Sequence, residues 1–329
     1  MFRVALIGAG RIGKIRAQVI QNDPTSELVA VADIRRAEMP DVPIVATDWK
    51  SVVASDVDAV VISTPTMLHA EIAMAAMHAG KHVLCEKPLG LNVEEAEQMC
   101  KVAAATGRIL KSGFNYRHMA HVQQAKNELE KNTIGAPHFL RCRFGHGGRS
   151  NYAKDWNTNS PGGGRVLLEQ GIHVFDLVRY LLGEPTSIVA RINQFYWPFP
   201  EDAEDNGFCL LQTTTGQIAQ IHVSWTQWRN IFEVEIFGKD GYMRLEGRDG
   251  HYGPQRLIVG KRQEDYSRPT EKTIEFANPM NAWTLEWNEF RSAIAEGRQP
   301  NGSSFDGLQA QRLVEAAYKS SETNTWITL

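Results

Sequence analysis

The sequence of 329 residues lacks any apolar run close to the ~18 residues that a membrane-spanning helix requires, so it predicts no membrane anchor. It also lacks an excess of positive charge, since 35 lysines and arginines stand against 38 aspartates and glutamates. The resulting net charge of −3 argues against a nucleic-acid-binding surface, which needs a clustered basic face. These absences leave an ordinary globular protein.

Cysteine is scarce, with four residues at positions 85, 100, 142 and 209 and no C-x-x-C spacing. This pattern indicates neither a disulfide framework nor a zinc ribbon, so we expect reduced thiols in the cytoplasm. A buried strand that begins at Phe2 leaves no room for a signal peptide, which supports the same expectation.

A glycine-rich turn between a strand and a helix stands at the start of the chain. The apolar, partly β-branched segment Val4–Gly8 is typical of a strand buried on both faces, and Lys14–Gln21 reads as a helix. The turn between them has the pattern G-x-G-x-x-G, which brings backbone N–H groups and a helix N-terminus to a pyrophosphate. The predicted dinucleotide-binding residues are Gly8, Gly10, Arg11, Ile12 and Gly13.

The second predicted strand, Glu27–Asp33, ends in an acid. Asp33 lies 20 residues beyond Gly13, where a dinucleotide fold places the carboxylate that binds the adenosine ribose. A carboxylate there repels a 2′-phosphate, so we expect NAD, with NADP as the alternative. Arg35 and Arg36 could receive that phosphate, although solvated charges at a helix start are their commoner role.

Strands and helices alternate through roughly residues 1–116, which predicts a parallel sheet of βαβ units. The carboxyl ends of parallel strands meet at one edge of the sheet, where such folds bind ligands. Loops that follow the predicted strands therefore form a candidate site; they are Gly8–Gly13, Asp33, Thr64–Thr66, Glu86–Pro88 and Asn115–Arg117.

Beyond residue 135 the pattern changes to strand-like segments joined by short turns such as Lys239-Asp240-Gly241. These joins predict hairpins and hence one large, mostly antiparallel open sheet in an α/β second domain. We place the cofactor-binding domain at residues 1–118 and the substrate-binding and oligomerisation domain at residues 119–329. Helices are expected at Gln170–Leu182, Trp283–Ile294 and Asp306–Ser320.

Large aromatic residues in the second sheet suggest a contact with a second copy of the chain. Trp225, Trp228, Phe232 and Phe237 would give the sheet a broad apolar face, so we expect a homodimer or homotetramer through it. A helix of the same chain covering that face is an equal alternative.

Lys87 follows a predicted sheet strand within Glu86-Lys87-Pro88. At the carboxyl edge of the sheet a lysine supplies a fixed positive charge and a donor. It could orient a substrate hydroxyl and stabilise the alkoxide that develops as hydride leaves. A lysine in a loop is ordinarily a surface residue, and only its place at this edge favours the catalytic interpretation.

Glu169 and His173 stand four residues apart in the segment Gly162–Asp176, so on a helix they share a face. A neutral imidazole can accept the proton of an alcohol and return it, while Glu169 could hold a substrate hydroxyl or orient the imidazole. Two alternatives are a purely structural His173 and a metal site with Asp176 as third ligand. We expect no metal, because Asp176 more plausibly caps the helix or pairs with Arg179.

The loop 145–164 is rich in polar and aromatic residues, which suit the hydroxyl edges and apolar faces of a sugar. Tyr152 and Trp156 are the weakly predicted substrate contacts there, beside Lys87, Glu169 and His173. A plain surface loop is the simpler interpretation.

The glycine turn, Glu86-Lys87-Pro88 and the Gly-rich segment ending in His173, in this order, resemble the glucose–fructose oxidoreductase/inositol dehydrogenase/MocA family over essentially the whole chain. The resemblance implies a Rossmann domain, a second domain with a large sheet, and assembly into dimers or tetramers. It also implies NAD(P)-dependent interconversion of a secondary alcohol and a ketone on a sugar or cyclitol.

By this resemblance Lys87 and His173 take the catalytic positions. The further positions near the cofactor or the substrate are Thr64, Pro65, His69, Glu86, Asn115 and Arg117. One difference is Glu169, where the family most often has Asp; the longer side chain moves the carboxylate by roughly one bond length.

The sequence therefore predicts an oxidoreductase that transfers hydride between NAD and a sugar-like alcohol. One alternative is a glycoside hydrolase of the same family that uses transient oxidation by a retained NAD. The other is a non-catalytic nicotinamide-binding sensor.

Overall fold

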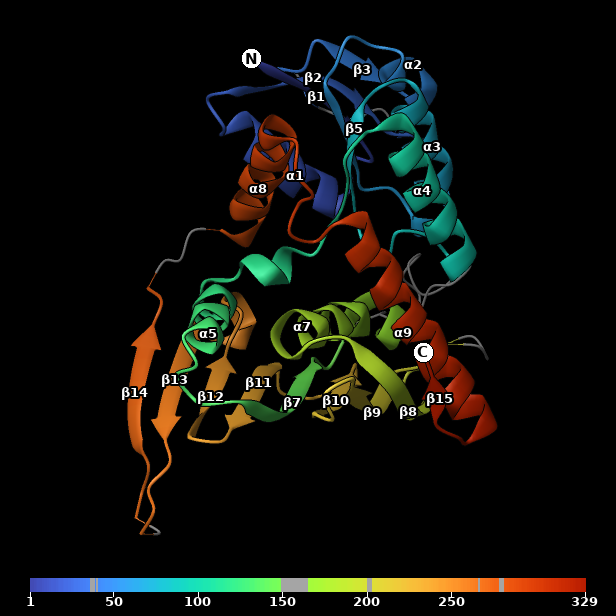
Figure 1. Cartoon of the computed structure of the whole chain (residues 1–329). Helices are drawn as coiled ribbons and strands as arrows, with labels where there is room; N and C mark the ends of the chain where they lie inside the picture. Colours follow the sequence, from blue (N-terminus) through green and yellow to red (C-terminus); the bar gives the residue numbers. More distant parts are fainter. Residues whose placement is uncertain (36–38, 40, 149–164, 200–202, 266, 278–280) are drawn as a thin grey trace. The chain divides into compact units, whose positions relative to one another are not determined.

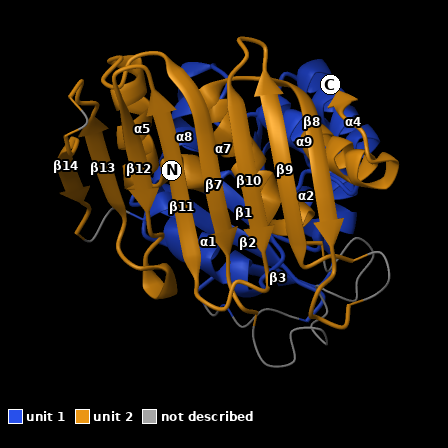
Figure 2. Ribbon diagram, turned by 90° about the horizontal axis from the view of Figure 1, so that it is seen from below, with its two compact units in different colours: residues 1–115, 281–311 blue, residues 116–280, 312–329 orange. Residues whose placement is uncertain are grey.

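The computed structural model describes residues 1–35, 39, 41–148, 165–199, 203–265, 267–277 and 281–329. It divides into two compact units, which Figure 2 colours separately. Unit 1 comprises residues 1–115 and 281–311, and unit 2 comprises residues 116–280 and 312–329. No helix in the described ranges is long and apolar enough to cross a membrane.

Unit 1 is built on a six-stranded sheet in the order β3-β2-β1-β4-β5-β6, with every neighbouring pair parallel (Figure 1). The strands are β1 (Phe2–Ile7), β2 (Ser26–Ala32), β3 (Ile44–Ala46), β4 (Ala59–Ile62), β5 (His82–Cys85) and β6 (Leu110–Ser112). The helices are α1 (Arg11–Gln21), α2 (Trp49–Val53), α3 (His69–His78), α4 (Val93–Thr106) and α8 (Ala282–Glu296). The predicted parallel sheet is confirmed, and its strand order reverses between β1 and β4, where such folds bind ligands.

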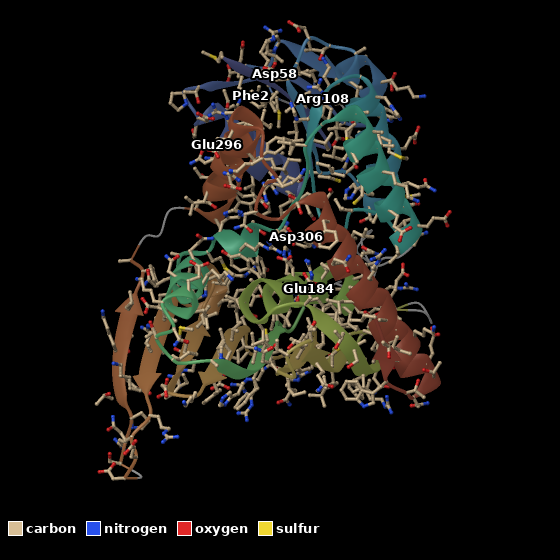
Figure 3. All side chains as sticks on the ribbon, in the orientation of Figure 1. Phe2, Asp58, Arg108, Glu184, Glu296 and Asp306 are labelled. Carbon is tan, nitrogen blue, oxygen red and sulfur yellow. The ribbon has the colours of Figure 1, made fainter. Side chains whose placement is uncertain are left out.

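Helix α8 belongs to unit 1 although residues 116–280 of unit 2 precede it in the sequence. Trp287 and Phe290 of α8 are buried in one core cluster with Val4 and Leu6 of β1. Phe2, labelled in Figure 3, has its ring centroid 6.1 Å from that of Trp287. A boundary at residue 118 assigns this helix to the C-terminal domain, whereas the structure groups residues 281–311 with unit 1 because α8 packs beside α1.

Unit 2 contains a nine-stranded sheet in the order β14-β13-β12-β11-β7-β10-β9-β8-β15. The strands are β7 (Pro137–Gly145), β8 (Pro185–Asn193), β9 (Asn206–Thr213), β10 (Ile218–Ser224), β11 (Ile231–Gly238), β12 (Gly241–Glu246), β13 (Arg256–Lys261), β14 (Thr270–Glu275) and β15 (Ile327–Thr328). Only the β7–β10 pair is parallel among these described strands, so the predicted large, mostly antiparallel sheet is confirmed. The helices of the unit are α5 (Ala120–Glu130), α7 (Ile172–Leu182) and the part of α9 (Ser304–Thr323) beyond residue 311.

One face of this sheet is covered by helices of the same unit, and the other is open (Figure 2). Helix α5 packs against β12 and β13, and α7 packs against β7. Trp225 and Phe232 point to the covered face and are 0% and 2% exposed, so the prediction that they form a partner surface is wrong. Phe237 alternates with Phe232 along the sheet and lies on the open face, in register with Phe139 of β7.

Candidate active site

The glycine loop of unit 1 fits a dinucleotide. A side chain on Gly8, where φ is +92°, would lie 2.6 Å from the backbone of Ser63, and one on Gly13 would lie 2.0 Å from the carbonyl oxygen of Gly8. These two glycines therefore allow β1, β4 and α1 to pack closely. A side chain on Gly10 would meet nothing within 4 Å. Gly10 precedes α1, which has no side-chain cap and no acid in its first turn, so its N-terminus is suited to a pyrophosphate.

Asp33 follows β2 at the same edge of the sheet. Its carboxylate accepts hydrogen bonds from the backbone N–H of Ala9 at 2.7 Å and of Arg35 at 2.9 Å. Asp33 is thus fixed directly beside the glycine loop, as a ribose-binding carboxylate needs to be. Arg35 is exposed, and Arg36, the other predicted phosphate ligand, lies outside the described residues.

His69 ties together the loops that follow β4 and β5. Its Nε2 lies 3.0 Å from the carbonyl oxygen of Thr64, and its Nδ1 lies 2.8 Å from that of Pro88. The side chain is 1% exposed, and burial lowers the pKa of the imidazole. His69 therefore holds the loops around Thr64 and Pro88 at a fixed separation.

Lys87 follows β5 in unit 1, two strands away from the glycine loop that follows β1. Its side chain is half-buried. The preceding residue, Glu86, is 8% exposed, and its carboxylate accepts hydrogen bonds from the guanidinium of Arg16 at 2.9 Å and 2.6 Å. The Glu86 side chain is thus bound to Arg16, and the next residue, Lys87, lies at the carboxyl edge of the sheet.

In unit 2, Glu169 lies on a π-helical turn, and His173 lies on the α-helix that follows it. Residues 167–171 form a π-helical turn, and α7 continues from Ile172 without a break. The sequence predicts a regular helix here; the wider turn changes the angle between the two side chains. Such π-helical turns are frequent at functional sites. Glu169 is half-buried, and His173 is 6% exposed.

The imidazole of His173 is oriented by Tyr116. The two rings are stacked, with centroids 4.0 Å apart and planes 6° from parallel. Tyr116 in turn contacts Phe144 and Phe232 of the covered sheet face edge-on, at 5.7 Å and 5.8 Å, and its hydroxyl is hydrogen-bonded to Arg248. Sequence reasoning missed Tyr116 and Arg248, although Tyr116 stands between two residues singled out there, Asn115 and Arg117.

Asp176, one turn beyond His173, contacts two arginines. Arg117 donates two hydrogen bonds to its carboxylate, at 2.8 Å and 2.6 Å, and Arg179 lies 3.8 Å away. Arg117 therefore anchors α7, and the predicted pairing with Arg179 is the weaker of the two. Across the described parts of the chain, no group of three or more His, Cys, Asp or Glu side chains could hold a metal ion.

Glu204 holds the start of the helical segment that carries Glu169. Its carboxylate accepts hydrogen bonds from the backbone N–H of Leu167 at 3.0 Å and from the hydroxyl of Tyr318 at 2.9 Å. Burial outweighs these contacts and raises the pKa of Glu204 to about 8. No signal in the sequence distinguishes Glu204 from the acids around it.

The remaining predicted residues are less informative. Pro65 accepts a backbone hydrogen bond from Leu68, and Asn115 begins a 3-10 turn after β6. Tyr152 and Trp156, the weakly predicted substrate contacts, lie outside the described residues.

Unit 1 thus presents a glycine loop, a ribose-type carboxylate and a lysine along one sheet edge, and unit 2 presents a carboxylate and a stacked imidazole. The family model for the NAD-binding Rossmann fold of the GFO/IDH/MocA oxidoreductases matches residues 2–114. The model for the GFO/IDH/MocA C-terminal domain matches residues 122–244. The chain belongs to the GFO/IDH/MocA family.

Relatives within the GFO/IDH/MocA family match over nearly the whole chain. Myo-inositol 2-dehydrogenase of Thermotoga maritima is 34% identical, over 99% of this chain and 98% of the relative. Inositol 2-dehydrogenase of Rhizobium meliloti is 31% identical, over 97% of this chain and 96% of the relative. The structure of a levoglucosan dehydrogenase in complex with NADH and L-sorbose has a TM-score of 0.88 at 25% identity, over 99% of this chain and 98% of that one.

Proposed function

We propose that this protein is an NAD-dependent dehydrogenase that interconverts a secondary alcohol and a ketone on a sugar or cyclitol. The observation that carries the proposal lies in unit 1. Lys87 follows β5 at the same sheet edge as a glycine loop whose Gly10 faces open space. The inositol and levoglucosan dehydrogenases among the relatives support a polyhydroxylated ring as the substrate.

Each unit has its own part in the proposed reaction. Unit 1 holds the cofactor through the glycine loop and Asp33, and unit 2 supplies the residues that hold the substrate. The bound nicotinamide supplies the position that gains or loses the hydride. Because Asp33 disfavours a 2′-phosphate, we propose NAD in preference to NADP.

Three side chains handle the alcohol. The ammonium of Lys87 donates a hydrogen bond to the reacting oxygen and stabilises the negative charge that grows on it. The imidazole of His173, held flat against Tyr116, accepts the hydroxyl proton in oxidation and returns it in reduction. Glu169 accepts a hydrogen bond from a neighbouring substrate hydroxyl and so fixes the orientation of the ring.

Replacement of Lys87 by Met tests this proposal. Wild-type protein should form NADH when NAD+ is supplied with myo-inositol or a related polyol. The kcat of K87M should be lower than that of wild type by about a hundredfold or more. The thermal shift produced by NADH alone should be the same in both proteins, because Lys87 acts on the substrate oxygen. Unchanged turnover in K87M, or no NADH formation by wild-type protein with any polyol, would overturn the proposal.

We propose in addition that a second copy of the chain covers the open face of the nine-stranded sheet. Arg141 and Arg143 project from β7 on this face beside Glu235 and Glu233 of β11, and Arg143 already forms an ion pair of 2.7 Å with Glu233 of the same chain. A two-fold axis would set the arginines of one copy against the glutamates of the other. The face also has a depression of about 690 Å³ that includes Phe208, which is 42% exposed.

We propose the cytoplasm as the location. Cys85, Cys142 and Cys209 are buried thiols, as expected in a reducing compartment.

A further inference from the structure

We propose that Arg16 and Glu286 are positioning residues for Lys87. They belong to a buried group of four charged side chains, called here the charge cluster, whose members are Arg16, Glu86, Lys111 and Glu286. The inference rests on the proposed function, because it concerns how the lysine assigned to the reacting oxygen is held in place. All four residues lie in unit 1.

Arg16 is the centre of the charge cluster. It lies on α1, just after the glycine loop, and is 2% exposed. Its guanidinium donates from Nε and Nη2 to Oε1 of Glu86, at 2.9 Å and 2.6 Å, while Nη1 lies 2.6 Å from Oε2 of Glu286. The same guanidinium lies 4.4 Å above the ring of Trp283 on α8. These contacts place a carboxylate on each side of one rigid, planar group, with hydrogen bonds to Glu86 and an ion pair with Glu286.

Lys111 completes the charge balance. Its Nζ lies 3.7 Å from Oε1 of Glu286 and donates a hydrogen bond to the carbonyl oxygen of Asn301 at 2.5 Å. Lys111 and Glu286 are both 0% exposed. Burial disfavours the charged form of Arg16, but Glu286 and Glu86 outweigh it and raise the pKa of Arg16. The charge cluster therefore brings two basic and two acidic side chains together in the buried interior of unit 1.

The charge cluster is connected to Lys87 through the backbone of Glu86. Glu86 is the residue before Lys87 and the first after β5, so fixing its carboxylate fixes the backbone from which the lysine projects. The space around the contact is limited: a side chain on Gly113 would lie 3.1 Å from Oε2 of Glu86 and 3.2 Å from Nη2 of Arg16. Since α1 also begins at the glycine loop, one guanidinium sets the separation between that loop and the catalytic lysine.

Stability alone does not account for this choice of residues. A buried ion pair is often replaceable by apolar side chains with no loss of stability, so its value lies in fixing one geometry. A misplacement of about 1 Å at a reacting group can lower a rate about a hundredfold. We infer that the charge cluster fixes the position of Lys87 relative to the glycine loop more closely than apolar side chains would.

Helix α8 offers a matched control. Arg291 on the same helix makes an ion pair of 2.5 Å with Asp23, which lies beyond the far end of α1. This pair also holds α8 against the rest of unit 1, and Arg291 makes its contacts with Asp23 and Thr25, at the opposite end of α1 from the glycine loop. Replacing Arg291 therefore loosens α8 without affecting the segment that carries Lys87.

The experiment compares Glu286→Gln and Arg16→Lys with Arg291→Met, in full-length protein shown to be folded by circular dichroism. E286Q and R16K should lower kcat by about tenfold or more, with KM for NAD+ within about twofold of the wild-type value. R291M should lower the thermal midpoint and leave kcat unchanged. Because R16K retains the charge and the approximate size, it keeps the test available where E286Q does not fold.

Wild-type kcat in both folded E286Q and folded R16K would overturn the inference, as would an equal loss of kcat in R291M. The result for K87M distinguishes this failure from failure of the proposed function. An inactive K87M beside fully active E286Q and R16K removes only the positioning role. A fully active K87M removes the proposed function itself.

Discussion

The imidazole of His173 lies flat against the phenol ring of Tyr116, with centroids 4.0 Å apart and planes 6° from parallel. Tyr116 is itself set by Phe144 and Phe232, which project from the covered face of the nine-stranded sheet. The orientation of the proposed base is thus determined by the sheet through an intermediate ring. We therefore expect Tyr116 to affect the proposed reaction through the orientation of the imidazole.

Replacement of Tyr116 by Leu should lower kcat by about tenfold, because the imidazole loses the surface that fixes its plane. The affinity for NADH, measured by thermal shift, should not change. Y116F keeps the stacked ring and loses the hydrogen bond with Arg248, so it should stay close to wild type. Equal kcat values for Y116L, Y116F and wild type would contradict a role for the stacked ring.

Replacement of Asp33 by Ser should shift the cofactor preference toward NADP. The substitution removes the charge that repels a 2′-phosphate, so kcat/KM for NADP+ should rise relative to NAD+ by about tenfold. The measurement is the ratio of the two kcat/KM values with one polyol. D33N, which is neutral but keeps an acceptor for the N–H of Ala9, separates the effect of charge from the effect on the loop. An unchanged ratio in both variants would show that Asp33 does not select the cofactor.

Glu204 should make the protein less stable as the pH rises. Burial raises its pKa to about 8 in the folded state, whereas an unfolded Glu titrates near its ordinary value of 4.5. Between these values the folded protein binds the additional proton, so its free energy of unfolding falls with increasing pH by up to about 1.4 kcal/mol per unit. Urea unfolding of wild type and E204Q from about pH 5 to about pH 8 measures this difference.

E204Q should lack this part of the slope. E275Q supplies the control, because it removes an exposed carboxylate on β14 in place of a buried one. Identical slopes in E204Q and wild type would mean that Glu204 is charged in the folded protein.

A charge on the open sheet face should dissociate the proposed oligomer. F208D introduces an acid beside the depression on this face, and sedimentation velocity should then show a lower molecular mass. Ile44 on β3 is equally exposed, at 42%, but lies in unit 1, so I44D should leave the mass unchanged. An unchanged mass in F208D, or a monomeric wild type, would remove the proposed interface.

The strand–turn–helix at the start of the chain and the parallel sheet of unit 1 could be read from the sequence, because buried strands and glycine turns leave local patterns. The placement of α8 could not be predicted from the sequence. Trp287 and Phe290 indicate an apolar helix face, but they do not indicate which sheet that face covers. The π-helical turn under Glu169 has no sequence pattern of its own.

The faces on which the aromatic residues of the second sheet lie are a second feature that the sequence does not predict. The prediction places Phe232 and Phe237 on one face, but they are five residues apart on β11 and therefore point to opposite faces. The sequence also does not show which of these faces the helices cover. The contacts of Arg16 with Glu286, and of Tyr116 with His173, join residues far apart in the chain, and single residues carry no trace of such pairing.

Helix α8 has a consequence for how the protein is made. The face of the first sheet formed by Val4, Leu6 and Leu84 is closed by Trp287 and Phe290, which the ribosome adds only after strands β7 to β14 of the second sheet. During synthesis this apolar face of unit 1 therefore stays exposed until nearly 300 residues have been added. A fragment that ends after β6 would keep that face exposed and should depend on chaperones, whereas a circular permutant that begins at α8 should complete its nucleotide domain first.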